Sequence, residues 1–283
     1  MKLPYQPDFN GKVAVVTGGA GVLCAMFAKT IAACGAKVAI LDLAADKGQL
    51  VVDEIHAAGG ESMVVKVNVL DQESVEAAHQ TVLDAYGKCD ILVNGAGGNN
   101  PRATCDDEFF CKETFDDPNK KSFFDLDPAG FDFVFNLNMK GTLLPTQCFA
   151  VDMLDRPGSV ILNISSMNAF TPLTKIPAYS AAKAAVSNFT QWLAVHFAKC
   201  GIRVNAIAPG FFSTTQNAKL LWNDDGTPTA RTDKILLNTP MSRFGEAEEL
   251  LGSLLFMLDN NASGFVTGVV LPIDGGFSAY SGV

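Results

Sequence analysis

The chain has 283 residues, of which 48% are hydrophobic and 18% charged, and its net charge is −9. This composition is typical of a folded protein with a large core, and it excludes a disordered chain. The negative charge and the lack of a clustered cationic face argue against nucleic acid as a partner. No run of apolar residues is long enough to span a bilayer, so we expect a cytoplasmic protein without a membrane partner.

The first half of the chain alternates short β-branched runs with longer amphipathic stretches. Helices are expected from the first glycine loop to Cys34, at 46–58 and at 72–86. Because the strand-like runs are apolar throughout and are joined by helical crossovers, they predict a parallel sheet buried on both faces. We therefore expect an α/β fold, a doubly wound sheet of about seven strands, in a single domain over residues 1–283. The expected strands lie within 12–18, 37–43, 62–69, 90–97, 158–166, 201–210 and 265–276.

Two segments, 97–131 and 211–238, interrupt this alternation. Both are polar, contain prolines and show no clear periodicity. Long irregular segments in compact domains often cover a binding site, and both follow the carboxyl end of a predicted strand, where open α/β sheets bind ligands. We interpret them as substrate-facing lids, with plain surface decoration as the alternative.

The motif TGGAGVL at 17–23 follows the first strand and opens the first helix. Glycines at this position allow the backbone to approach a pyrophosphate at the positive end of the helix. Asp42 ends the second strand, where a carboxylate can accept hydrogen bonds from an adenosine ribose and would repel a 2′-phosphate. No lysine or arginine accompanies it, which favours NAD over NADP. The alternative is a helix-capping loop with a surface aspartate.

Tyr179 and Lys183 are four residues apart in a helical pattern, and Ser166 lies thirteen residues before the tyrosine. Residues four apart share a helix face, so the lysine ammonium can stabilise the phenolate and lower the pKa of the phenol. A shift from about 10 towards about 7 would need roughly 4 kcal/mol, which the lysine and a cofactor cation could share. The serine would then hold the oxygen that is protonated.

Other catalytic classes find little support in the sequence. The three histidines, 56, 79 and 196, fall on predicted helices without a paired carboxylate, and no GxSxG motif occurs, which argues against a hydrolase. They also have no metal-ligand spacing. The seven cysteines contain no CxxC pair, which predicts free thiols in a reducing compartment.

These motifs resemble the short-chain dehydrogenase/reductase family across nearly the whole chain, together with NGAG at 94–97, FNLNMKG at 135–141 and Pro209-Gly210 followed by Thr214. The resemblance implies a Rossmann fold, nicotinamide chemistry and a homotetramer. It implies a catalytic tetrad of Asn138, Ser166, Tyr179 and Lys183, in which Asn138 holds a water and Lys183 binds the nicotinamide ribose. The implied cofactor contacts are Gly18, Gly21, Val22, Leu23, Asp42, Asn68, Val69, Asn94, Ala96, Gly97, Tyr179, Lys183, Pro209, Gly210 and Thr214.

Three features depart from the family pattern. Val22 and Cys24 stand where the first loop normally has glycines, and Asn68 replaces the usual aspartate of the adenine pocket. The family's NNAG is NGAG here, with Gly95 in second place. We expect cofactor binding to survive, because a helix N-terminus still presents amides to phosphate and an amide side chain can pair with adenine.

Within the family, NISSMNAF, the segment around Tyr179 and DGGFSAYSGV resemble a subgroup named D-mannonate oxidoreductase or fructuronate reductase. This resemblance implies a sugar-acid substrate, which needs a cation for its carboxylate and polar side chains for its hydroxyls. The alternatives are a dehydrogenase of another polyol or aldonate such as gluconate, an acyl ketoreductase, or a dinucleotide-binding regulator without catalysis. Substrate-binding candidates, each of which could instead be a solvated loop residue, are Asn99, Asn100, Arg102, Asn168 and Lys175.

Overall fold

A parallel sheet forms the centre of the computed structural model, which describes residues 7–213 and 218–282. In this part of the chain the sheet has seven strands in the order β3-β2-β1-β4-β5-β6-β7, and every pair of neighbours is parallel. The predicted doubly wound α/β fold is confirmed. The strands are β1 (Val13–Thr17), β2 (Lys37–Asp42), β3 (Glu61–Lys66), β4 (Ile91–Asn94), β5 (Val160–Ile164), β6 (Arg203–Pro209) and β7 (Val270–Ile273).

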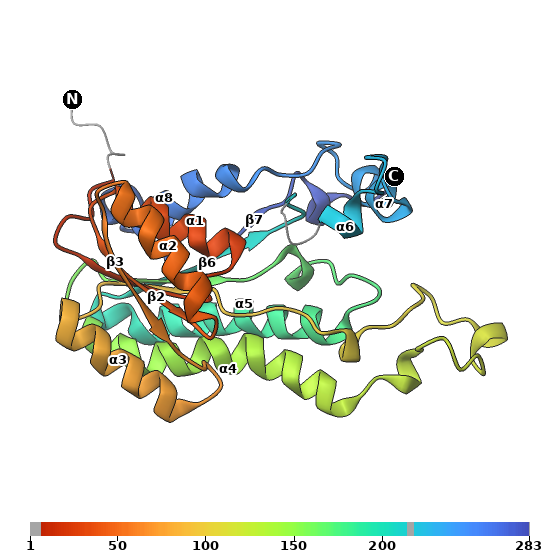
Figure 1. Ribbon diagram of the computed structural model, residues 1–283, viewed down its shortest axis with the longest axis horizontal. Coiled ribbons are helices and arrows are strands. Elements are labelled where there is room, and N and C mark those ends of the chain that lie inside the picture. The colour runs from red at the N-terminus through yellow and green to blue at the C-terminus, as the bar shows by residue number, and fades with distance from the viewer. Residues whose placement is uncertain (1–6, 214–217, 283) are drawn as a thin grey trace.

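Helices cover both faces of the sheet (Figure 1). One face packs on α1 (Val22–Ala33), α2 (Ala45–Ala57) and α8 (Leu251–Leu258), and the other on α3 (Gln72–Tyr86), α4 (Pro128–Met153) and α5 (Pro177–Phe197). Successive residues of a strand point to opposite faces, so an unbroken apolar run such as VAVVT in β1 supplies both cores. All five residues of β1 are buried.

The two irregular segments lie at the carboxyl ends of the strands. The first projects from the body of the molecule in Figure 1 and carries the single 3₁₀ turns η1 (Pro101–Ala103), η2 (Lys112–Thr114) and η3 (Phe123–Asp125). It ends at Asp127, four residues before the predicted bound at 131, because the Asp127 side chain accepts a hydrogen bond from Ala129 N–H and starts α4. The second contains α6 (Ala218–Leu221) and α7 (Ala230–Leu237), which the sequence analysis did not predict.

Short 3₁₀ turns also occur at η4 (Met167–Ala169), η5 (Ala198–Cys200) and η6 (Ala247–Leu250). The short helix α9 (Asn260–Ser263) leads into β7, and the chain then forms a last 3₁₀ turn, η7 (Phe277–Ala279). Among residues 7–213 and 218–282, none of the helices combines the length and the hydropathy that crossing a bilayer requires.

Candidate active site

The candidate site lies at the carboxyl ends of β1 and β4. The chain runs from β1 outward to β3 and then returns to β4 on the other side of β1. This reversal leaves a crevice between the two halves of the sheet, which is where open α/β sheets bind dinucleotides. The loops after β1, β4, β5 and β6 all begin at this edge, so segments distant in sequence meet here.

The glycine loop is pressed against the loop that follows β4. Gly18 has φ +65°, and a β-carbon there would lie 2.8 Å from Cα of Ala96. Glycine is therefore required at this position for two reasons, the backbone conformation and the close approach of Ala96. Gly21 caps α1 with its backbone and provides no side-chain cap, so amides of the first turn, at Val22 and Leu23, can receive an anion. These features fit a bound pyrophosphate.

Asp42 lies at the end of β2, beside the glycine loop. Its Oδ2 accepts a hydrogen bond from Ala20 N–H at 3.0 Å, and its Oδ1 accepts one from Ala44 N–H at 2.9 Å. Both oxygens are thus oriented by the backbone at the rim of the crevice. A carboxylate can accept further hydrogen bonds, so this one can still bind ribose hydroxyls.

Two departures from the family pattern compensate each other. A β-carbon at Gly95 would lie 2.2 Å from Sγ of Cys24 and 2.9 Å from the Thr17 carbonyl oxygen. The cysteine on α1 therefore occupies the space that a side chain at position 95 would need. Burial raises the pKa of the Cys24 thiol to about 12, so the sulfur is a neutral packing group. Glycine at position 95 therefore leaves room for both the Cys24 sulfur and the Thr17 carbonyl oxygen.

This pairing predicts non-additive effects on stability. Gly95→Ala should lower the free energy of unfolding by about 2 kcal/mol through overpacking, and Cys24→Gly should cost about 1 kcal/mol or more through the helix glycine and the cavity. The double variant should lose less than the sum, because the sulfur no longer meets the new methyl group. Urea unfolding at one protein concentration measures all three. Gly252→Ala is the control, since a β-carbon added there would have no atom within 4 Å apart from its own helix backbone and chain neighbours. Strictly additive losses of stability would contradict the pairing of Cys24 with Gly95.

The side chain of Asn94 is not directed to a cofactor. It is buried, and its Nδ2 donates to Thr146 Oγ1 and to Asn163 Oδ1, both at 2.9 Å. Asn163 in turn donates to Thr190 Oγ1. This network joins β4 and β5 to α4 and α5 and commits Nδ2 of Asn94, whereas its Oδ1 has no hydrogen-bond partner among the described residues.

Tyr179 and Lys183 share one face of α5, as predicted. Nζ of Lys183 lies 5.6 Å from the centroid of the Tyr179 ring and donates a hydrogen bond to the Ile164 carbonyl oxygen at 2.8 Å. Ser166 follows β5 by two residues and is buried, with 7% of its surface exposed. Its hydroxyl interacts with the phenol of Tyr179 and accepts a hydrogen bond from Asn168 N–H at 3.3 Å. The three side chains predicted from the sequence therefore converge at one point.

The expected low pKa of the phenol is wrong for the protein alone. Burial raises the pKa of Tyr179 above 10.0, and the hydrogen bond with Ser166 opposes this rise. Burial also lowers the pKa of Lys183 from 10.5 to about 8. The charge of Lys183 favours a low pKa of the phenol, but removing both groups from water has the larger effect. At neutral pH the site therefore holds a protonated phenol beside an ammonium.

Asn138 fixes the backbone at the rim of the site. It lies on α4 with none of its surface exposed; its Nδ2 donates to the carbonyl oxygens of Gly98 and Val134 at 2.8 Å, and its Oδ1 accepts from Gly98 N–H at 3.1 Å. A β-carbon at Gly97 would lie 2.5 Å from this Oδ1 and 3.2 Å from Nζ of Lys183. Both amide hydrogens of Asn138 are committed, so its side chain acts as a clamp on residues 97–98.

The remaining predicted cofactor residues that the structure describes lie in two places, after β3 and at the end of β6. Val69 is buried, and Asn68 beside it is exposed, with its Oδ1 accepting from Leu70 N–H at 3.1 Å. Gly210 follows Pro209 at the end of β6, and a β-carbon there would lie 2.6 Å from Cα of Asp274. Thr214 lies outside the described residues.

The predicted substrate residues behave differently from one another. Arg102 is held by Asp127, with Nε 2.6 Å from Oδ2, and so supports the start of α4 instead of facing a substrate. Asn99 donates to Thr104 Oγ1 at 3.0 Å, and Asn100 caps the turn η1. Asn168 is 4% exposed, and its Oδ1 has no hydrogen-bond partner among the described residues. A buried acceptor without a partner suits a substrate hydroxyl.

Comparison with known proteins identifies the family. Residues 12–225 match the family described as short chain dehydrogenase. The chain belongs to this family. An uncharacterized oxidoreductase from Haemophilus influenzae is 57% identical over 284 residues, covering 100% of this chain and 99% of that protein. An uncharacterized oxidoreductase, UxuB, from Bacillus subtilis is 52% identical over 282 residues, covering 99% and 100%.

A solved structure is also closely similar. It is that of a Haemophilus influenzae protein provisionally named D-mannonate oxidoreductase, with bound NAD. It superposes with a TM-score of 0.94, at 58% identity over 98% of each chain. As a member of the short-chain dehydrogenase family, the protein is an oxidoreductase that acts on CH–OH groups.

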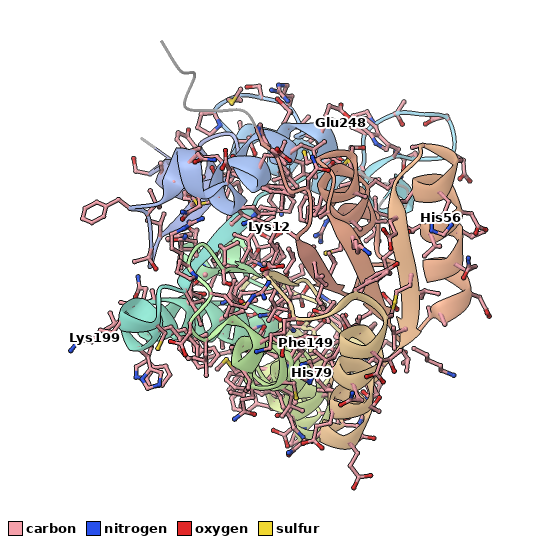
Figure 2. The ribbon with its side chains drawn as sticks, turned by 90° about the vertical axis from the view of Figure 1, so that its left-hand side faces the viewer. Lys12, His56, His79, Phe149, Lys199 and Glu248 are labelled. Carbon is pink, nitrogen blue, oxygen red and sulfur yellow. The ribbon has the colours of Figure 1, made fainter. Side chains whose placement is uncertain are left out.

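One histidine has a carboxylate partner, contrary to the sequence analysis. Nε2 of His79 on α3 lies 3.0 Å from Oδ2 of Asp152 on α4, and Figure 2 shows the imidazole beside Phe149, with ring centroids 4.9 Å apart. The same Asp152 oxygen accepts a hydrogen bond from Cys89 N–H, just before β4 begins. This pair therefore lies at the amino ends of the strands, at the opposite edge of the sheet from the dehydrogenase site, and joins α3 to α4.

A cavity of about 510 Å³ lies beside the site, between residues 171–176 and α7. The segment 171–176 directly precedes the helix that carries Tyr179. Lys175 was predicted from the sequence, but two cations of α7 that also line the cavity, Arg231 and Lys234, were not. The helix that carries these cations could have been predicted from the sequence. Thr229 caps α7 through a hydrogen bond from Thr232 N–H, and TARTDKILL has the pattern of a capped amphipathic helix.

Proposed function

We propose that the protein catalyses reversible, NAD-dependent hydride transfer at a secondary alcohol or ketone of a sugar acid, with D-mannonate and D-fructuronate as the first candidates. The observation that carries the chemistry is the convergence of Ser166, Tyr179 and Lys183 at the carboxyl edge of the sheet. A nicotinamide cofactor, when bound, supplies or accepts the hydride. We propose that residues 1–283 form one dinucleotide-binding domain.

NAD is the cofactor that the crevice fits. The uncapped start of α1 suits a pyrophosphate, and the Asp42 carboxylate suits the ribose of an adenosine without a 2′-phosphate. The similar Haemophilus influenzae structure holds NAD. We assign the cofactor contacts to the backbone of the glycine loop and residues 94–97, to Asp42, to the loops at 68–69 and 209–210, and to Lys183 at the nicotinamide ribose.

In the reductive direction, the Ser166 hydroxyl donates a hydrogen bond to the carbonyl oxygen of the substrate. As hydride reaches the carbonyl carbon, the C–O π electrons move to oxygen, and Tyr179 transfers its phenolic proton to the developing alkoxide. The ammonium of Lys183 stabilises the phenolate that remains. Asn138 holds residues 97–98 in place at the edge of this site. Because burial raises the pKa of Tyr179, the donor is protonated at neutral pH.

A sugar acid is favoured by two observations. The cavity beside the site carries Lys175, Arg231 and Lys234, and the unpartnered Oδ1 of Asn168 can accept a hydrogen bond from a hydroxyl. Two relatives carry names of the same class: one is provisionally named D-mannonate oxidoreductase, and another, 29% identical over 266 residues, is the 5-keto-D-gluconate 5-reductase of Escherichia coli.

A screen of NADH oxidation tests this function. D-Fructuronate is expected to be reduced with the highest kcat/KM among keto-hexonates, neutral ketoses and 3-oxoacyl esters, and NADPH should serve at least tenfold less well than NADH. Preference for 5-keto-gluconate would indicate a different aldonate dehydrogenase, and preference for an acyl ester would indicate a ketoreductase. If no ketone led to NADH consumption, the remaining interpretation would be a dinucleotide-binding regulator without catalysis.

We also propose a cytoplasmic homotetramer. The exposed face of α5 includes Trp192 and Val195, which are 55% and 80% exposed in the single chain. Exposed apolar side chains on neighbouring turns of one helix favour burial against another subunit. The mass in solution, measured by light scattering, would be four times 30.0 kDa; a monomer would contradict the proposal.

A further inference from the structure

The cavity beside the site has an unusual charge for this protein. It is lined by three cations, Lys175, Arg231 and Lys234, and by one carboxylate, Glu108. The chain as a whole carries a net charge of −9. A local excess of two positive charges in an acidic protein raises the local concentration of anions and repels cations. Its volume of about 510 Å³ lies within the range of small-molecule sites.

The three cations are not equally available to a ligand. Lys234 is paired with Glu108, with Nζ 2.7 Å from Oε1. Nζ of Lys175 donates to the carbonyl oxygen of Asp106. The side chain of Arg231 makes neither a hydrogen bond nor an ion pair with any residue of 7–213 or 218–282. Lys175 and Arg231 thus both lack a carboxylate partner among these residues, and Arg231 is the one whose side chain donates no hydrogen bond.

The surroundings fix the backbone of α7 around Arg231, whose side chain is exposed. The Glu108–Lys234 pair joins the projecting segment to α7, one turn after Arg231. Thr232, next to Arg231, is fully buried, and its hydroxyl donates to the Leu221 carbonyl oxygen at 2.5 Å. The backbone of α7 is thus anchored on both sides of the arginine. A guanidinium in such a place offers a planar fork that matches the two oxygens of a carboxylate.

We propose that Arg231 binds the carboxylate of the substrate and sets the preference of this enzyme for sugar acids over neutral sugars. The inference rests on the proposed function and deepens it. The cavity is bounded by 171–176, which lies between Ser166 and Tyr179, and by Phe211, which follows Gly210. A six-carbon acid with its carboxylate at Arg231 would extend its hydroxyls and ketone from α7 towards the catalytic side chains. Lys175 would add a second, weaker attraction.

Kinetics with two matched substrates test this role. D-Fructose differs from D-fructuronate by a hydroxymethyl group in place of the carboxylate. Arg231→Gln should raise KM for D-fructuronate about 30- to 100-fold and change kcat less than threefold, because it removes binding energy that is present before the reaction begins. The kcat/KM for D-fructose should stay within twofold of the wild type. Arg231→Lys should recover part of the loss, since it restores the charge without the fork.

The control is Lys199→Gln, which changes the net charge equally at a residue that Figure 2 shows at the outer edge of the molecule. It should leave both substrates unaffected. An unchanged KM for D-fructuronate in Arg231→Gln would overturn the inference while the proposed function stands. An equal loss with both substrates would also overturn it, since that indicates a structural role. A wild-type enzyme that reduces no sugar acid would refute the proposed function itself, and the inference with it.

Discussion

Replacement of Tyr179 with phenylalanine is expected to reduce turnover about 10²- to 10⁴-fold in both directions, the range that a positioned acid or base contributes. The change deletes one hydroxyl group, which is the proposed proton donor. The ring that packs beside Lys183 remains, with its centroid 5.6 Å from Nζ in the wild type. NADH binding, measured by fluorescence titration, should therefore change less than threefold.

Tyr280→Phe makes the same chemical change at a tyrosine that is 45% exposed, and it serves as the matched control. It should retain full activity. If Tyr179→Phe kept more than a tenth of the wild-type turnover, the proton would come from another group. If it lost NADH binding as well, the phenol would belong to the cofactor site, and the activity loss would say nothing about proton transfer.

The sheet could be predicted because its physical cause is local. Each strand of a doubly wound sheet is buried on both faces, so it appears in the sequence as an unbroken apolar run such as VAVVT or VILNI. The motif residues at the strand ends were predictable for the same reason. Once the strands are in order, topology brings Gly18, Ser166 and Gly210 to one edge.

The parts that the sequence did not predict depend on contacts between distant segments. Cys24 and Gly95 look like two separate departures from a motif until the sulfur is found 2.2 Å from the missing β-carbon. Arg102 was a plausible carboxylate ligand, but Asp127 neutralises it, 25 residues away. His79 seemed unpaired because its partner, Asp152, is 73 residues away. No local pattern contains these pairings.

The error about the pKa of Tyr179 has the same origin. Spacing on a helix correctly predicted that Lys183 lies beside the phenol, but burial depends on what covers the site. Burial moves the pKa of each group towards its neutral form, upward for the tyrosine and downward for the lysine. The protein alone is thus prepared to donate a proton, which suits reduction of a ketone at neutral pH. Oxidation of the alcohol should accelerate as pH rises, because it needs the phenolate.

Loss of the Lys183 charge is the second change with a large expected effect. Lys183→Met should lower kcat about 10²-fold or more, because no ammonium remains to stabilise the phenolate of Tyr179. In the wild type the pKa of Lys183 is about 8, so kcat/KM for ketone reduction should fall as pH rises through 8, by up to tenfold per unit. The methionine variant should lack this decrease. A wild-type profile that stays flat to pH 9.5 would contradict the role of the ammonium.

The buried ammonium should also leave a signature in stability that is independent of catalysis. The pKa of Lys183 is about 8 in the folded chain and 10.5 as a free side chain, so between these values the unfolded chain binds more protons. The contribution of this lysine to folding is therefore least favourable below pH 8, and it improves by up to about 3 kcal/mol as pH rises to 10.5.

Lys183→Met removes the cost of burying a charge. Relative to the wild type, the variant should be most stabilised at pH 7, and this advantage should shrink by pH 10, as measured by urea unfolding. Lys199→Met, at an exposed lysine, should show no such trend. An advantage of Lys183→Met that is constant with pH would mean that the lysine keeps its ordinary pKa in the folded protein, and the ammonium would then be held by more than the Ile164 carbonyl oxygen.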